Sequence, residues 1–126
     1  MPGHRLQVLV AAGLVDKIKA GATFVSFHQV NGDLEWMKAV HSEVEPLDAV
    51  LLTSCNTDGD AGMFMMSGPE GLVKQLGPLA ATAMEGRGGG KGRFQGKVKN
   101  AGSDARTAAL AAIEAKLQAL DGAGAE

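Results

Sequence analysis

The order of helical and strand patterns along this chain predicts an α/β fold, a mixed sheet covered by helices with an amphipathic helix at its N-terminus. Segments with apolar residues at helical spacing alternate with short strand-like runs. One of these runs, "DAVLLTSC", is apolar almost throughout, which is typical of a strand whose two faces are both covered. With 126 residues, of which 45% are hydrophobic and 21% charged, the chain has the size and composition of one folded domain.

The first half of the chain predicts a helix, a strand and a second helix. Residues 1–21 form the first helix, because apolar residues recur every three or four positions and the cations Lys17 and Lys19 stand in its last turn. "ATFVSFHQV", residues 22–30, is rich in aromatic and β-branched residues and predicts a strand. The next helix runs from about 33 to 45 and ends before a proline.

The second half predicts the rest of the sheet and its other helices. Strands at 48–54 and 62–67 are joined by the turn "NTDGDAG", so we expect them to pair antiparallel. A helix from 69 to 83 begins with proline and glutamate, which favour a first turn. After a glycine-rich segment, "QGKVKN" at 95–100 predicts a short strand, and a serine-capped pattern predicts a helix over 103–119.

We divide the chain into an N-terminal helix at 1–21, a domain at 22–120 and a disordered tail at 121–126. The lone cysteine, Cys55, follows apolar residues, so we interpret it as a buried small hydrophobe. A single thiol also favours a reducing compartment, and we expect the protein to be cytoplasmic. No stretch reaches the roughly 18 to 20 apolar residues that span a bilayer, so we expect no membrane partner.

The charge of the chain is concentrated in its glycine-rich segment. Five cations and one anion between Glu85 and Asn100 give this segment a net charge of +4, whereas the whole chain carries −2. Glycines there allow backbone N–H groups to approach a ligand as an anion-binding nest, and the cations suit phosphate. These residues are Arg87, Lys91, Arg93, Lys97 and Lys99, with glycines at 86, 88, 89, 90, 92 and 96. A solvated loop without a ligand is the alternative interpretation.

The string "GRGGGKGRFQG" is not a P-loop, because it lacks the spacing and the following Ser or Thr, and it follows a predicted helix rather than a strand. It resembles the glycine-rich motif of the DHH-associated domain that ends alanyl-tRNA synthetases and the AlaX-type alanyl-tRNA editing proteins. The longer string "GKGRFQGKVKN" is most similar to the eukaryotic free-standing editing proteins. The resemblance takes in roughly residues 22–118.

This resemblance implies an α/β nucleic-acid-binding module that helps to hold tRNA and contributes to dimerisation. Carried over onto this sequence together with the local charges, it assigns nucleic-acid binding to Arg87, Gly88, Gly89, Gly90, Lys91, Arg93, Phe94, Gln95, Lys97 and Lys99. Two departures stand out. Lys91 occupies the place of a histidine in DHH phosphoesterases, which argues against that activity, and "QGKV" replaces the usual "QAGG" exit.

The editing activity of AlaX-type proteins resembles zinc-dependent hydrolysis by histidine and cysteine motifs in a separate upstream domain. The histidines of this chain do not form that pattern, and a catalytic zinc needs about three protein ligands. We therefore expect no metal, no cofactor and no catalysis by this chain alone. We interpret His28 as a strand histidine satisfied by its neighbours and His41 as a solvated helix residue.

Several functional alternatives stay open on the sequence. Phe94 either stacks on an exposed base or anchors the loop to the core. The leading hypothesis is a non-catalytic tRNA-binding module with a separate editing or synthetase domain as its partner. The alternatives are an accessory part of an alanyl-tRNA editing hydrolase and a self-association module that forms a homodimer.

Overall fold

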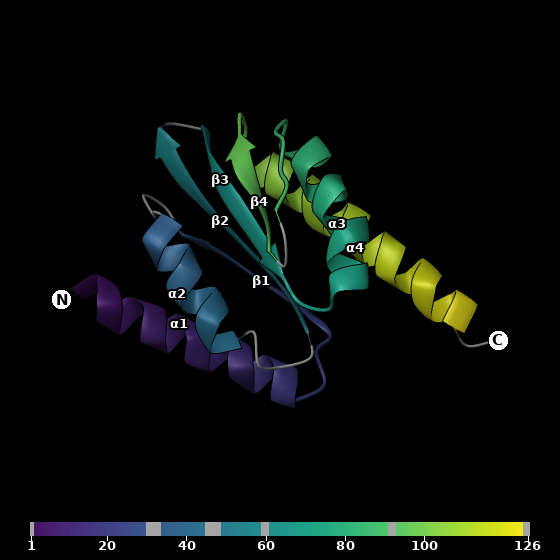
Figure 1. The fold of residues 1–126 in the computed structure, drawn as a ribbon, viewed down its shortest axis with the longest axis horizontal. Coiled ribbons are helices and arrows are strands. Elements are labelled where there is room, and N and C mark those ends of the chain that lie inside the picture. The colour runs from purple at the N-terminus through teal and green to yellow at the C-terminus, as the bar shows by residue number, and fades with distance from the viewer. Residues whose placement is uncertain (1, 30–33, 45–48, 59–60, 91–92, 125–126) are drawn as a thin grey trace.

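The computed structural model describes residues 2–29, 34–44, 49–58, 61–90 and 93–124 (Figure 1). Helices alternate with strands along the chain, apart from one pair of consecutive strands, which gives an α/β protein. The elements are α1 (Pro2–Lys19), β1 (Phe24–Gln29), α2 (Leu34–Val44), β2 (Val50–Asp58), β3 (Ala61–Ser67), α3 (Glu70–Ala83), β4 (Phe94–Val98) and α4 (Ser103–Gly124). No helix in the described part of the chain is long and apolar enough to cross a bilayer.

The four strands form one mixed sheet in the order β1-β2-β3-β4. β1 and β2 are parallel, with Phe24 opposite Val50, because α2 carries the chain back to the start of the sheet between them. β2, β3 and β4 follow as an antiparallel series. The sheet therefore has β1 and β4 at its opposite edges.

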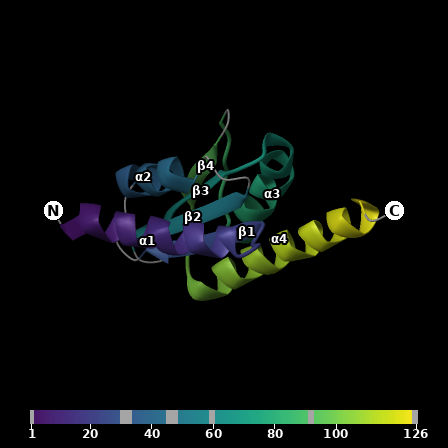
Figure 2. The same ribbon diagram turned by 90° about the horizontal axis from the view of Figure 1, so that it is seen from below.

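Helices α1 and α2 cover one face of the sheet (Figures 1 and 2). The apolar stripe of α2, which includes Met37, Val40 and Val44, packs on strand residues such as Leu51 and Met65. Leu14 of α1 joins the same cluster. The alternation of residues along β2 explains why Leu51 and Cys55 face this layer while Leu52 faces the other.

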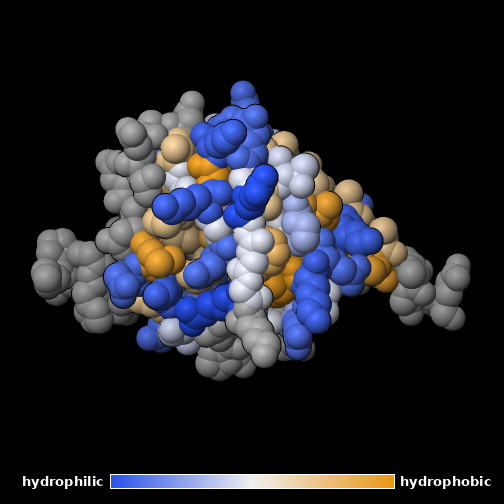
Figure 3. All heavy atoms as spheres, turned by 45° about the horizontal axis from the view of Figure 1, so that its top comes forward, coloured by the Kyte–Doolittle hydropathy of each residue, from blue (hydrophilic) through white to orange (hydrophobic). Residues whose placement is uncertain are grey.

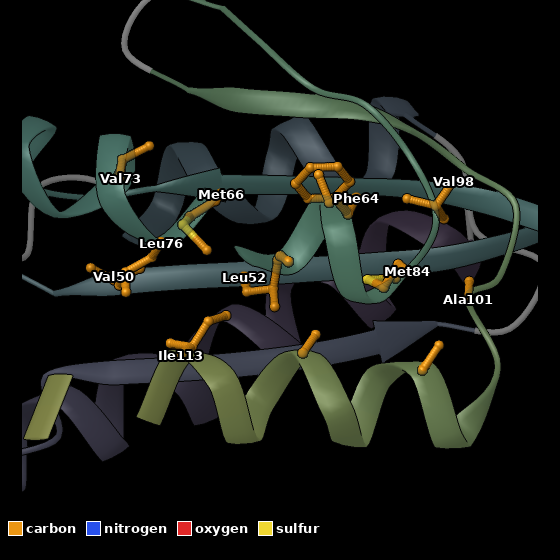
Figure 4. Close-up of a cluster of buried hydrophobic side chains, with 14 residues drawn as sticks. Val50, Leu52, Phe64, Met66, Val73, Leu76, Met84, Val98, Ala101 and Ile113 are labelled. Carbon is orange, nitrogen blue, oxygen red and sulfur yellow. The ribbon is translucent and has the colours of Figure 1, made fainter. Parts of the chain in front are cut away.

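Helices α3 and α4 cover the opposite face (Figure 4). Phe64 and Met66 of β3 and Leu76 of α3 are fully buried in this second cluster, and Ile113 contributes from α4. The small residues of α4, with Ala109 fully buried, let that helix approach α3 closely. Two hydrophobic layers on either side of one sheet explain why β2 is apolar almost throughout.

The predicted fold class is confirmed, and the elements lie close to their predicted ranges. The C-terminal ends of two elements, β2 and α4, differ from the prediction by more than the fraying of an element's last residues. β2 continues to Asp58, into the segment predicted to be a turn, because a β-bulge between Asn56 and Asp58 lets pairing with β3 continue. α4 continues to Gly124 rather than ending near 119. The division into domains stays a prediction.

The interpretation of His41 as a solvated residue was wrong, whereas that of Cys55 as a buried thiol is confirmed. His41 is fully buried between α2 and the sheet, where its Nε2 is 2.8 Å from Thr53 Oγ1 and its Nδ1 bonds to the hydroxyl of Ser67. Its place among Met37, Val40 and Val44 on the apolar side of α2 explains the burial. The strand hydroxyls supply the partners that a buried imidazole requires.

Candidate nucleic-acid interface

The glycine-rich segment leaves α3 through a Schellman turn. The N–H of Gly86 donates to the carbonyl of Ala81 at 2.8 Å, and that of Glu85 donates to the carbonyl of Thr82 at 3.2 Å. This turn places its C′ residue in the left-handed region, and Glu85 has φ 55°. The chain is thereby reversed out of the helix and directed along β4.

The segment then pairs with β4 as an additional, irregular strand at the edge of the sheet. Gly89 and Gln95 exchange two hydrogen bonds of 3.0 and 3.1 Å, and Arg87 N–H donates to the Lys97 carbonyl at 3.3 Å. At the end of the paired region nearest α3, the Lys99 N–H donates a hydrogen bond to the Glu85 carbonyl. We call residues 85–90 and 93–99 the basic hairpin. Lys91 and Gly92, both part of the predicted site, lie outside the described residues.

The register of the basic hairpin places its cations on one side. Because Gly86 faces Val98 and Gly89 faces Gln95, Arg87 stands directly opposite Lys97. Directly opposite residues of an antiparallel pair project from the same face. Val98 is buried against α3 and α4, so the odd-numbered positions face the other way, and Arg87, Lys97 and Lys99 are exposed there. Gln95 is exposed on the same face.

These three cations border one surface depression of about 450 Å³, which Glu85 also lines. Within the described ranges, no ion pair is formed by Arg87, Lys97 or Lys99. Two cations held opposite each other without a carboxylate between them generate a positive local potential. In Figure 3, which brings this end of the molecule forward, hydrophilic side chains flank a pale strip of near-neutral residues.

Arg93 connects the basic hairpin to the neighbouring helix. Its Nη2 donates to Ser42 Oγ at 3.1 Å, and Ser42 lies in the last turns of α2. The two residues are 51 positions apart in the chain, so no local pattern pointed to Ser42. The bond places the Arg93 guanidinium between the hairpin and α2, next to the exposed face of β4.

The close contacts of most glycines in this region are with the protein itself. A Cβ at Gly96 would lie 1.7 Å from the Arg87 carbonyl oxygen, and one at Gly86 would lie 2.4 Å from that of Lys97. A Cβ at Gly88 would lie 2.4 Å from the ring of Phe94. Glycine is therefore required for the hairpin to lie flat on its neighbours.

This finding changes the expected role of the backbone as an anion nest. The N–H groups of Arg87 and Gly89 are already paired within the hairpin, so they are not free for a ligand. Gly88 lies between them, and its N–H points to the free edge, where the structure records no partner among the described residues. Gly90 has φ 128°, which only glycine adopts readily, and Gly89 has open space around its Cα.

Phe94 has its ring in the core rather than in solution. The ring centroid lies 5.7 Å from that of Phe64, and the side chain packs against the cluster under α3 and α4. Gly77 of α3 and Gly88 lie against the same ring, where any Cβ would come within 2.6 Å. Of its two predicted roles, the geometry favours the anchor, which holds the hairpin on α3.

Among the described residues, no three His, Cys, Asp or Glu side chains lie close enough to share a metal ion. The absence of a metal stays a prediction for the chain as a whole. What the interface offers chemically is a set of positive charges on a rigid backbone. Such a surface suits a polyanion.

Sequence comparison relates the chain to alanyl-tRNA editing proteins. It is 34% identical over 108 residues to the alanyl-tRNA editing protein Aarsd1 of Danio rerio, covering 85% of this chain and 26% of that protein. It is 37% identical over 93 residues to Aarsd1-B of Xenopus laevis, covering 73% of this chain and 22% of that protein. The chain thus spans about a quarter of the length of these curated relatives. No family model matches the sequence.

The fold has a counterpart among solved structures. The C-Ala domain of Aquifex aeolicus alanyl-tRNA synthetase superposes with a TM-score of 0.58 over 75% of this chain and 90% of that domain, at 15% identity. This match shows the fold and not the function. The chain is therefore a homologue of part of the Aarsd1 alanyl-tRNA editing proteins, with a fold like that of the C-Ala domain.

Proposed function

We propose that this chain is a non-catalytic module that binds tRNA through the exposed face of the basic hairpin. The observation that carries the proposal is the cross-strand pair of Arg87 and Lys97, with Lys99 beside it and no ion pair formed by any of the three within the described ranges. Arg93 adds a fourth cation next to α2. Lys91, which belongs to the same glycine-rich segment of the sequence but lies outside the described residues, is part of the same proposal.

The spacing of these cations suits a nucleic-acid backbone better than a single small anion. Arg87 and Lys97 stand on adjacent strands, and Lys97 and Lys99 are two residues apart along one strand, about 7 Å. Successive phosphates of a nucleic acid offer charges at comparable intervals. Contacts of this kind fix the position of an RNA without reading its sequence.

The names of the relatives support tRNA as the nucleic acid. Aarsd1 proteins are called alanyl-tRNA editing proteins, and the C-Ala domain is part of an alanyl-tRNA synthetase. Because the chain spans about a quarter of those relatives, we infer that a separate editing or synthetase domain supplies the chemistry and that this module supplies tRNA affinity. We expect this activity in the cytoplasm, an expectation that the free, buried thiol of Cys55 and a tRNA partner support.

Affinity for tRNA and its dependence on salt test the proposal. Replacing Arg87 and Lys97 together with alanine should weaken binding about tenfold at low salt and reduce the log-log salt slope by about 1.4 to 1.8, since two phosphate contacts are lost. The matched control is Lys19→Ala with Lys116→Ala, which removes the same charge from exposed positions on α1 and α4. Fluorescence anisotropy with labelled tRNA between about 50 and 200 mM salt measures both quantities.

Equal losses in the two double variants would mean that net charge, not the hairpin, attracts the RNA. Unchanged affinity in the Arg87/Lys97 variant would contradict the proposal outright. Self-association is the remaining alternative for this module. Light scattering of the parent and of the hairpin variant separates it, because a dimer built on the hairpin dissociates in the variant even without RNA.

A further inference from the structure

A second cavity lies at the opposite edge of the sheet, between β1 and α4. It has a volume of about 290 Å³ and is bounded by Ser26 and His28 of β1, Ser54 of β2 and Arg106 of α4. Ser26, His28 and Arg106 are half-buried, so the cavity is reached from solvent. β1 and β4 are the two edges of the sheet, which separates this cavity from the basic hairpin.

The floor of the cavity is a fixed hydrogen-bonded group. His28 and Ser54 are register partners on parallel strands, and His28 Nδ1 lies 2.8 Å from Ser54 Oγ. His28 Nε2 donates to the side-chain oxygen of Asn56, so Nδ1 accepts the proton of the Ser54 hydroxyl. The imidazole is thereby held in one tautomer and one orientation. Such preorganisation lowers the cost of binding a ligand.

The wall opposite the floor supplies a positive charge. Arg106 Nε donates to the carbonyl of Ala101 at 3.0 Å, which fixes the side chain over the cavity. The terminal nitrogens of its guanidinium have no hydrogen bond or ion pair among the described residues. Ser26 offers a hydroxyl for which the described part of the chain likewise records no partner. None of the described residues that line the cavity carries a carboxylate.

The remaining wall is apolar, with Leu52 and Met84 from the core and Leu110 from α4. A cavity with a few convergent polar groups and an otherwise apolar lining is typical of a small-molecule site. Its volume of about 290 Å³ is just below the range of roughly 300 to 1,000 Å³ for such sites, which suits a small metabolite.

We propose that this cavity binds a small organic anion, a phosphate monoester or a carboxylate with an apolar body, whose charged end contacts Arg106 and Ser26 and whose body lies on Leu52 and Leu110. A guanidinium pairs with both kinds of oxyanion through two parallel hydrogen bonds. The apolar wall gives the body a place out of water. This site is independent of RNA binding by the basic hairpin.

Four probes separate the contributions of charge and body. Phenyl phosphate and benzoate carry both, inorganic phosphate carries only the charge, and benzyl alcohol carries only the ring. Titration of the isotope-labelled chain, followed by amide and imidazole NMR shifts, should show saturable changes at Ser26, His28 and Arg106 with phenyl phosphate or benzoate. Inorganic phosphate and benzyl alcohol should each bind at least about tenfold more weakly. The lower of the two dissociation constants, for phenyl phosphate or for benzoate, identifies the kind of anion that the cavity prefers.

Two variants with a matched control test the assignment. Arg106→Gln should weaken phenyl phosphate and benzoate about tenfold or more, down to the level of benzyl alcohol, because a charge-assisted pair is lost. Lys116→Gln, an exposed cation on the same helix, should bind like the parent. Ser26→Val should block binding while leaving Arg106 in place, and a β-branched residue is well tolerated on a strand.

The proposal is wrong if neither aromatic anion gives saturable shifts up to about 10 mM, well above a millimolar dissociation constant. It is equally wrong if folded Arg106→Gln binds like the parent, or if the shifts map to Arg87 and Lys97. If inorganic phosphate bound as tightly as phenyl phosphate, the apolar part of the ligand would contribute nothing to affinity, and the proposal of an organic anion would be wrong. The dispersion of the amide spectrum shows in each case that the variant is folded.

Discussion

The two edges of the sheet carry polar groups in different ways. At the β4 edge the charges of Arg87, Lys97 and Lys99 stand in water, on a hairpin whose glycines pack tightly beneath them. At the β1 edge the polar side chains are drawn inward, and His28 is half-buried and bonded to Ser54.

The charged groups therefore contribute differently to folding stability at the two edges. Exposed cations at the β4 edge contribute little to folding stability, so they can be replaced without unfolding the domain. The glycines beneath them determine the conformation of the hairpin backbone. At the β1 edge the polar groups themselves are part of the packed structure, and changing them affects stability and its dependence on pH. The following predictions test each part of this contrast.

The largest effect is expected from Gly96→Ala. The new Cβ would lie 1.7 Å from the Arg87 carbonyl oxygen, so the hairpin must move away from β4. We expect the free energy of unfolding to fall by about 2 to 3 kcal/mol, the upper range for overpacking. Urea denaturation followed by circular dichroism measures it.

Gly89→Ala is the matched control, since nothing lies within 4 Å of its added Cβ and its φ is not in the left-handed region. It should change stability by less than about 0.5 kcal/mol. Similar losses in the two variants would mean that glycine flexibility, and not the close approach at Gly96, is what the hairpin needs.

Phe94→Leu distinguishes an anchor from a stacking platform. Leucine keeps an apolar side chain against Phe64 and Gly77, so we expect a loss of stability below about 1.5 kcal/mol and tRNA affinity within twofold of the parent. If the ring stacked on a base, its loss would instead cost about 1 to 3 kcal/mol of binding. Anisotropy with labelled tRNA and urea denaturation of the same preparation decide between the two.

The fold was predictable where one local pattern dominates. The apolar run around Leu51 and the helical stripe of α2 both identified their elements. The pairing of residues 86–89 with β4 was not predictable, because glycine has a low β-propensity and the pairing depends on the contacts that Gly86 and Gly88 make in the folded chain. The prediction that His41 is exposed was wrong because it relied on the nearby acidic residues Glu43 and Glu45, although the position of His41 on α2 faces the core.

The candidate site was predictable in composition but not in geometry. The sequence concentrates cations in one segment, whereas only the register shows that Arg87 faces Lys97. The contact of Arg93 with Ser42 and the cavity formed by Ser26 and Arg106 join residues from distant parts of the chain. Contacts of that kind follow from tertiary packing, which local periodicity does not encode.

Glu85→Gly should stabilise the protein. Glu85 has φ 55°, and the left-handed conformation costs a non-glycine residue about 1 to 2 kcal/mol. The greater entropy of unfolded glycine offsets part of this gain, so we expect a net increase of about 0.5 to 1 kcal/mol. Glu85→Ala removes the same charge without relieving the backbone, and it should bring no such increase. Equal gains in both variants, measured by thermal denaturation, would assign the effect to charge.

The smallest effect concerns His28 and the pH dependence of stability. Burial lowers the pKa of His28 below its usual 6.5, the hydrogen bond to Asn56 opposes this shift, and the nearby Arg106 guanidinium adds to it. Well above pH 6.5 the imidazole is neutral in both the folded and the unfolded chain, so its contribution to stability is complete. As the pH falls below 6.5, the unfolded chain takes up the proton first, and stability declines until the pH passes the lower pKa of the folded state.

His28→Gln should therefore flatten the decline in unfolding free energy between about pH 7.5 and 5.5. Over that interval, the decline in unfolding free energy should differ between the variant and the parent by less than about 1 kcal/mol, because the half-exposed site is screened by solvent. The buried His41 is present in both proteins, so its contribution cancels in the comparison. The Arg87/Lys97 double alanine variant serves as the control from the other edge and should decline like the parent. A parent and a His28→Gln variant with the same decline would show that the β1 edge does not couple folding to pH.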